Sequence, residues 1–143
     1  MSNRINIVKE AYKGMAALES YIQASGLTKT HQELIKIRAS QINGCAYCLD
    51  MHTKDARKNG ETEQRIYTLS AWRETPFFDE KEQAILALTE EVTLISKGGV
   101  SDDTYNKAIT VLGEAYFTQV YVAIITINGW NRIAIGTKME PGA

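Results

Sequence analysis

The sequence predicts an all-α protein that folds as a single domain, residues 1–143, with about six or seven helices. Three observations support this class. Apolar residues recur every three to four positions in successive segments, and no segment alternates apolar and polar residues over a strand length. The chain has only two prolines, which leaves room for long uninterrupted helices. It also contains no internal repeat, and 143 residues suffice to bury one core.

The N-terminal third predicts two helices joined by a short loop. The first covers residues 5–22 and is closed by Gly26; its apolar residues lie at helical spacing, namely Val8, Ala11, Met15, Leu18 and Ile22. Thr30, followed three positions later by Glu33, has the pattern of a capping box that opens the second helix. That helix carries Leu34, Ile35, Ile37, Ala39 and Ile42, and we expect it to end at Asn43-Gly44.

A third helix is expected directly after Gly44, so the turn between the second and third helices must be tight. It runs to about Lys58 and stops at Asn59-Gly60, with Asp50 and Lys54 forming a favourable i,i+4 pair. A shorter helical segment, Glu63–Trp72, follows and is broken by Thr75-Pro76.

Three more helices complete the prediction. Asp79 and Glu82 have a pattern similar to a capping box and open a helix that we expect to end at Gly98-Gly99. The apolar stripe of this helix is Ile85, Leu88, Val92 and Ile95. Ser101 caps the next, whose apolar face is Tyr105, Ile109 and Leu112. The last helix, residues 114–135, is apolar nearly all round, which indicates a helix that is central to the core or shared with a partner chain.

Charge and targeting signals exclude several classes of function. Sixteen basic residues are balanced by 17 acidic ones, so a nucleic-acid or anionic-membrane partner is not expected. The last helix is too short and too interrupted by polar residues for a membrane span. The N-terminus lacks the apolar region of a signal peptide, so we expect a cytoplasmic protein. In that compartment a cysteine pair is catalytic, redox-sensing or metal-binding more often than structural.

Both cysteines and one of the two histidines lie in a nine-residue stretch, Gly44–His52. On a helix, Cys48 and His52 lie about 300° and 340° from Cys45, so two thiols and an imidazole share an arc about 60° wide. We expect Cys45 in the first helical turn, where unpaired N–H groups favour a thiolate, whereas His52 favours ionisation of Cys48. Oxidation of one cysteine would let the other form a disulfide.

Other interpretations of this stretch are weaker. Paired cysteines can be core filler, although a histidine on the same arc argues against this. Cys45, Cys48 and His52 could bind zinc, but only His31 or a carboxylate could supply the fourth ligand. Covalent haem attachment requires histidine directly after the second cysteine, where this chain has Leu49. A thioredoxin-like fold would place the motif in a βαβ context, which the sequence lacks.

The spacing Glu33-x11-Cys45-x2-Cys48-x3-His52 resembles the AhpD-like alkylhydroperoxidases of the carboxymuconolactone decarboxylase superfamily. This spacing is much more specific than a lone Cys-x-x-Cys. The segment from Ile42 to Cys48 is also similar to the family core, and weaker similarity extends through 69–73 and the helix near Asp79 to 128–132. The resemblance covers nearly the whole chain.

The resemblance implies an all-helical fold that forms homo-oligomers, trimers or hexamers, and an enzyme that reduces hydroperoxides with its cysteine pair. It implies that Cys48 is the peroxidatic cysteine, that Cys45 resolves the sulfenic acid, and that Glu33 and His52 form a proton relay. An external dithiol, from a lipoyl protein or a thioredoxin-like protein, would reopen the disulfide, and no metal or organic cofactor is required. Tyr47 stands where some members have a further histidine, and a phenol is a poor base at neutral pH.

The remaining candidate residues have simpler expected roles. Glu33, taken alone, is a helix-capping residue, and only the resemblance favours its relay role. His31 is expected to be exposed in a first turn, and Asp55 to lie on a solvated face rather than to orient the imidazole. Trp72 and Trp130 are expected as core or interface anchors. Two alternative functions stay open: a lactone-decarboxylating enzyme of the same superfamily, and a non-catalytic redox sensor or stress-response module.

Overall fold

The computed structural model describes residues 4, 7 and 9–142, and these residues form seven α-helices and one 3-10 helix, without a strand. The helices in chain order are α1 (Lys9–Ala24), α2 (Lys29–Asn43), α3 (Ala46–Lys58), α4 (Glu63–Thr68), the 3-10 helix η1 (Leu69–Glu74), α5 (Glu80–Thr93), α6 (Asp102–Leu112) and α7 (Glu114–Gly136). The predicted all-α class is therefore confirmed. Val8 and the predicted start of the first helix lie outside the described residues.

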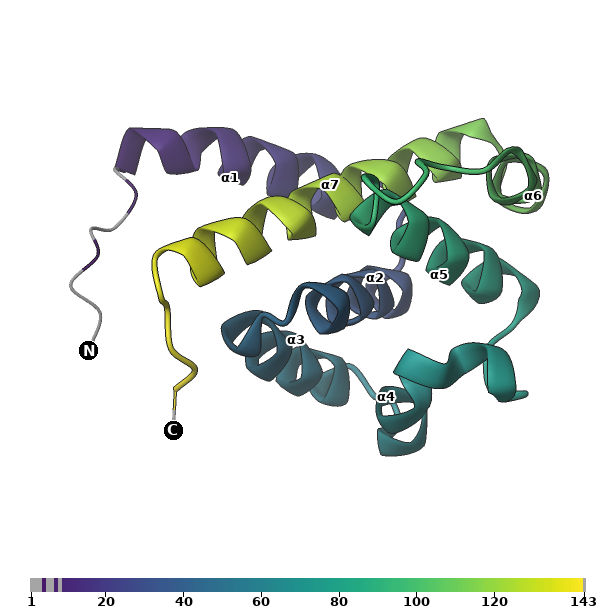
Figure 1. The fold of residues 1–143 in the computed structure, drawn as a ribbon, viewed down its shortest axis with the longest axis horizontal. Coiled ribbons are helices and arrows are strands. Elements are labelled where there is room, and N and C mark those ends of the chain that lie inside the picture. The colour runs from purple at the N-terminus through teal and green to yellow at the C-terminus, as the bar shows by residue number, and fades with distance from the viewer. Residues whose placement is uncertain (1–3, 5–6, 8, 143) are drawn as a thin grey trace.

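Helices α2 and α7 form the centre of the fold: α3, α5 and α7 pack against α2, and α7 contacts α1, α2, α3, α5 and α6 (Figure 1). This confirms the central position expected for the last helix. One core cluster joins α2 with α1, α5, α6 and α7; its fully buried side chains include Ile22, Ile35, Ile85, Leu88, Val120, Ile124 and Ile127. A second joins α2 with α3, α4, η1 and α5, and includes Leu34, Ile37, Leu69, Trp72 and Leu86. Trp72 is 6% exposed, which confirms its expected role as a core anchor.

The start of α2 differs from the sequence prediction. Thr28, not Thr30, is the N-cap: its backbone is extended and its side chain accepts a hydrogen bond from the N–H of His31. Thr30 lies inside the helix, so the predicted capping box with Glu33 is wrong. Glu33 is 6% exposed and faces the protein interior, where it is available for another role.

The end of α5 also differs from the prediction. The α-helix stops at Thr93, Leu94 leaves the helical conformation, and turns lead to Gly98 and Gly99. Ile95 is consequently 52% exposed instead of continuing the buried stripe. The predicted helix Glu63–Trp72 is likewise divided into α4 and the tighter η1.

Other local predictions are confirmed. Asp79 and Glu82 form a reciprocal capping box at the start of α5, and the Ser101 side chain accepts a hydrogen bond from the N–H of Thr104 at the start of α6. The exposed pair of Lys54 and Asp50 has an N–O distance of 3.0 Å.

His31 is half-buried, not exposed as predicted, because its ring packs edge-on against Tyr116 of α7. Its Nδ1 lies 2.6 Å from the Tyr116 hydroxyl. Burial, which disfavours the imidazolium, lowers the pKa of His31, although the carboxylates of Glu82 and Asp79 oppose this shift. His31 is therefore an interhelical contact between α2 and α7.

Among helices in the part of the chain that the structure describes, none has the length and apolar character needed to cross a bilayer. Helix α7 buries one face against the core and leaves Ile125 and Ile135 nearly half exposed.

Candidate active site

The turn between α2 and α3 is very tight, as predicted. Gly44 ends α2 in the left-handed conformation, with φ of 71°, which glycine adopts without steric cost. The N–H of Cys45 donates to the carbonyl of Ser40, and α3 begins at the next residue. Two residues thus reverse the chain and place α3 against α2.

An asparagine network holds this turn against α7. The Asn43 side-chain amide donates to the side-chain oxygens of Asn128 and Asn131, each at 2.9 Å. Asn131 is fully buried and donates to the Ser40 hydroxyl at 3.0 Å. Because buried amides are costly unless they are hydrogen-bonded, this network fixes α2 and α7 in one relative position.

Cys45 and Cys48 form a disulfide in this structure, with their Cα atoms 5.4 Å apart. Cys45 is the N-cap of α3 and lies one position before the first turn in which it was predicted, because its backbone is extended. Its sulfur nevertheless accepts a hydrogen bond from the Cys48 N–H, at 3.3 Å. The sulfur of Cys45 therefore meets the positive end of the α3 dipole. Both cysteines are buried.

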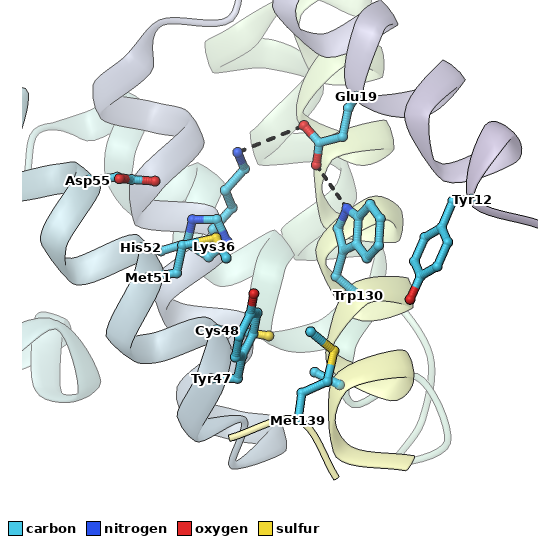
Figure 2. A pocket seen from close by; sticks show the side chains of 11 residues that line it. Tyr12, Glu19, Lys36, Tyr47, Cys48, Met51, His52, Asp55, Trp130 and Met139 are labelled. Carbon is cyan, nitrogen blue, oxygen red and sulfur yellow. Dashed lines mark hydrogen bonds and ion pairs between the residues drawn. The ribbon is translucent and has the colours of Figure 1, made fainter. Parts of the chain in front are cut away.

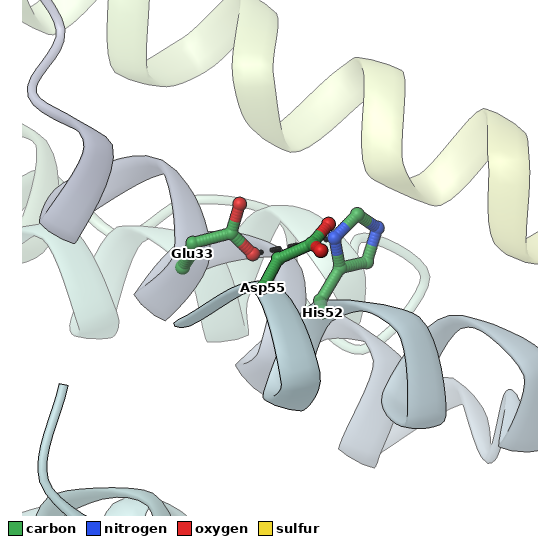
Figure 3. Close-up of side chains that lie close together, drawn as sticks. All are labelled: Glu33, His52 and Asp55. Carbon is green, nitrogen blue, oxygen red and sulfur yellow. Dashed lines mark ion pairs between the residues drawn. The ribbon is translucent and has the colours of Figure 1, made fainter. Parts of the chain in front are cut away.

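Glu33 and His52 face one another across the contact between α2 and α3. The distance from Glu33 Oε2 to His52 Nδ1 is 3.3 Å, and the two side chains are 8% and 12% exposed. In Figure 3 the second ring nitrogen of His52 points away from Glu33. The carboxylate of Glu33 is thus placed to orient the imidazole ring of His52.

Asp55, one turn beyond His52, joins this group. One of its carboxylate oxygens lies within 4.8 Å of ligand atoms of both Glu33 and His52, and the residue is half-buried. The expected placement on a solvated face is therefore wrong, because α3 packs on α2 at this level and partly covers the carboxylate. His31, the histidine considered as an additional zinc ligand, contacts Tyr116 instead.

A pocket of about 440 Å³ opens beside the disulfide (Figure 2). It is lined mainly by apolar and aromatic side chains, with a few polar groups; the lining residues are Tyr12, Glu19, Lys36, Tyr47, Cys48, Met51, His52, Asp55, Trp130, Ala134 and Met139. Cys48 lines this pocket and Cys45 does not. Of the two sulfurs, Cys48 is thus the one next to the space that a substrate would occupy.

Trp130 forms one wall of the pocket rather than only anchoring helices. Its ring stacks on Tyr12 with centroids 5.8 Å apart, and its indole N–H donates to Glu19 at 3.0 Å. The Oε2 atom of Glu19 also lies 4.0 Å from the Nζ atom of the buried Lys36. Glu19 and Lys36 were not predicted from the sequence as pocket residues. For Lys36 the sequence did contain a signal, because it follows Glu33 by about one helical turn and therefore lies on the same face of the helix.

Three comparisons relate this chain to known proteins. The family model described as carboxymuconolactone decarboxylase family matches residues 9–91, more than half of the chain. The uncharacterised protein YdfG of Bacillus subtilis is 47% identical over 138 residues, which are 94% of each protein.

Two solved structures are also similar to this chain. A protein of unknown function from Agrobacterium tumefaciens, described as a candidate AhpD antioxidant defence protein, is 42% identical, with a TM-score of 0.94 over 100% of this chain and 99% of that one. An uncharacterised peroxidase-related protein from Silicibacter sp. TM1040 shares the fold at 23% identity, with a TM-score of 0.81 over 94% of this chain and 71% of its own. The resemblance seen in the cysteine motif is confirmed, and the chain belongs to the carboxymuconolactone decarboxylase family, with an AhpD-like fold.

Proposed function

We propose that the protein is a thiol-dependent reductase of organic hydroperoxides. One observation carries this proposal: Cys45 and Cys48 form a disulfide, and Cys48 lines a pocket together with His52. The description of the related Agrobacterium tumefaciens protein as a candidate antioxidant defence protein is consistent with it.

The proposed reaction begins with the reduced dithiol. The Cys48 thiolate attacks the terminal peroxide oxygen, the O–O bond breaks, and the departing alkoxide takes a proton from His52, which leaves an alcohol and a Cys48 sulfenic acid. The Cys45 thiol gives its proton to His52, and the resulting thiolate, stabilised at the N-terminus of α3, attacks that sulfur. The S–O bond breaks, and the departing hydroxide takes the proton back from His52 and leaves as water as the disulfide forms. An external dithiol, from a lipoyl or thioredoxin-like protein, then reduces the disulfide by thiol exchange and is itself oxidised.

The pocket supports an organic hydroperoxide as the substrate rather than hydrogen peroxide. A mostly apolar cavity of about 440 Å³ can bury an alkyl or aryl group, and this burial lowers KM. The test is a steady-state assay of cumene hydroperoxide and hydrogen peroxide, with dihydrolipoamide or thioredoxin as electron donor. Consumption of neither peroxide by the reduced protein, with either donor, would refute the proposal.

Experiments on the same purified protein distinguish two alternative functions from peroxide reduction. Conversion of a carboxymuconolactone by a variant without cysteines would indicate the decarboxylase activity instead. A reductant-dependent change of assembly state without peroxide turnover would indicate a redox sensor. The exposed apolar residues of α7, Ile125 and Ile135, support a homo-oligomer, which we propose as a trimer or hexamer; light scattering measures this directly.

The proposed proton relay through Glu33 and His52 predicts a loss of activity in Glu33→Gln. The amide keeps the size of the side chain but cannot stabilise an imidazolium at His52, so kcat/KM for cumene hydroperoxide should fall about 10- to 100-fold. Circular dichroism should be unchanged. The control is Glu63→Gln, which alters an exposed carboxylate on α4 and should retain full activity. Full activity in Glu33→Gln would exclude the relay.

A further inference from the structure

We propose that Glu33, His52 and Asp55 form a binding site for a divalent transition-metal ion. The three side chains point toward one another across the α2–α3 contact (Figure 3). One ligand atom from each residue lies within 4.8 Å of the other two, so the set comprises two carboxylate oxygens and one imidazole nitrogen. The nitrogen next to Glu33 is His52 Nδ1.

The second observation is that buried lone pairs in this group have no hydrogen-bond partner. Glu33 Oε2 and His52 Nδ1 are 3.3 Å apart, yet neither atom makes a hydrogen bond within the described part of the chain. Two ligands bound tetrahedrally at about 2.0–2.2 Å from one ion are separated by about 3.3–3.5 Å. The observed 3.3 Å separation of Glu33 Oε2 and His52 Nδ1 lies within this range, so one ion can bind both atoms.

The charges of the group also favour a cation. The carboxylate of Glu33 is buried and that of Asp55, close to it, is half-buried, so two negative charges lie in one small region. A divalent ion bound to a neutral imidazole would balance both. The other charged groups at the pocket, Lys36 and Glu19, form a pair of their own with an N–O distance of 4.0 Å.

The ligand types define the class of ion. One imidazole and two carboxylates suit zinc or manganese, and three protein ligands leave a position for water. The ion would bind through the same atoms of Glu33 and His52 that act in the proposed proton relay. Metal binding should therefore inhibit peroxide reduction, a consequence that rests on the proposed function, whereas the site itself does not.

The test uses the oxidised protein, because its disulfide prevents the cysteines from binding the metal. Titration with zinc chloride in a calorimeter should give one ion per chain, and Asp55→Asn should weaken the affinity at least about tenfold. The matched control is Asp50→Asn on the same helix, whose carboxylate pairs with Lys54; it should bind zinc as the unmodified protein does. Circular dichroism verifies that each variant is folded.

A crystal of the oxidised protein soaked in zinc chloride gives an independent readout. An anomalous peak between Glu33, His52 and Asp55 would support the site. The absence of zinc binding at millimolar concentration, or equal affinity in Asp55→Asn, would overturn it. If the reduced enzyme turns over no peroxide while the oxidised protein still binds zinc at these residues, the proposed function fails and the metal site stands.

Discussion

Replacing Cys48 by serine is expected to lower kcat/KM for cumene hydroperoxide by at least about a thousand-fold. A serine hydroxyl at the same position is not ionised at neutral pH and does not cleave an O–O bond, so the covalent step is lost. The fold should persist, because serine has nearly the size of cysteine and the core clusters around α2 are unchanged. The measurement is a steady-state assay alongside circular dichroism.

Cys45→Ser is the matched control for that variant, because it distinguishes the two sulfurs. If Cys48 is the peroxidatic residue, Cys45→Ser should reduce about one equivalent of peroxide per chain and then stop as a sulfenic acid. Trapping with dimedone followed by mass spectrometry should locate the label on Cys48. A burst in Cys48→Ser and none in Cys45→Ser would reverse the order of the two cysteines.

Arg65→Met is expected to lower the free energy of unfolding by about 2–4 kcal/mol, because it leaves the buried carboxylate of Glu82 without its partly buried cationic partner. Arg65 connects α4 to α5: it binds the carboxylates of Glu61 and Glu82 and donates to the Phe77 carbonyl at 2.7 Å. Its hydrogen bond to Glu82 raises the pKa of the guanidinium, which therefore stays charged. Without it, the carboxylate of Glu82, which is 5% exposed, has no cationic partner among the residues that the structure describes.

Chemical denaturation measures this loss, with Lys54→Ala as the control. Lys54 pairs with Asp50 on an exposed face, so its removal should cost less than about 1 kcal/mol. In the double variant Arg65→Met with Glu82→Met, part of the lost stability should return, because the buried charge of Glu82 is removed together with its partner, although the carboxylate of Glu61 stays. A loss below about 1 kcal/mol in Arg65→Met would contradict the assignment of a buried pair.

The helices themselves were largely predictable, because local signals dominate them. Asp79 and Ser101 cap their helices as predicted, since a side-chain oxygen that accepts from an N–H three residues later needs no tertiary partner. Thr28 and Thr30 show the limit of such signals. Both can cap a helix, and the extended backbone at Thr28 decides between them.

The central position of α7 was predictable from apolarity, because it is the most apolar helix and five other helices contact it. The equally central position of α2 was not predictable in this way. Its pattern is obscured because Gln32, Glu33, Lys36 and Ser40 are buried despite being polar. Each is compatible with burial only through a partner that the tertiary structure provides, such as Asn131 for Ser40.

The sequence by itself placed Cys48 and His52 on one face of a helix, because the helical period converts their spacing into a direction. Cys45 was expected in the same helix but precedes it as the N-cap. Only the tertiary structure decided what that face meets. The left-handed turn at Gly44 and the packing of α3 on α2 bring Glu33 to His52 and partly bury Asp55 beside them. The 3.6-residue period of a helix fixes the angular positions of side chains around one helix axis. The distances between side chains of two helices depend instead on the packing of every side chain between them.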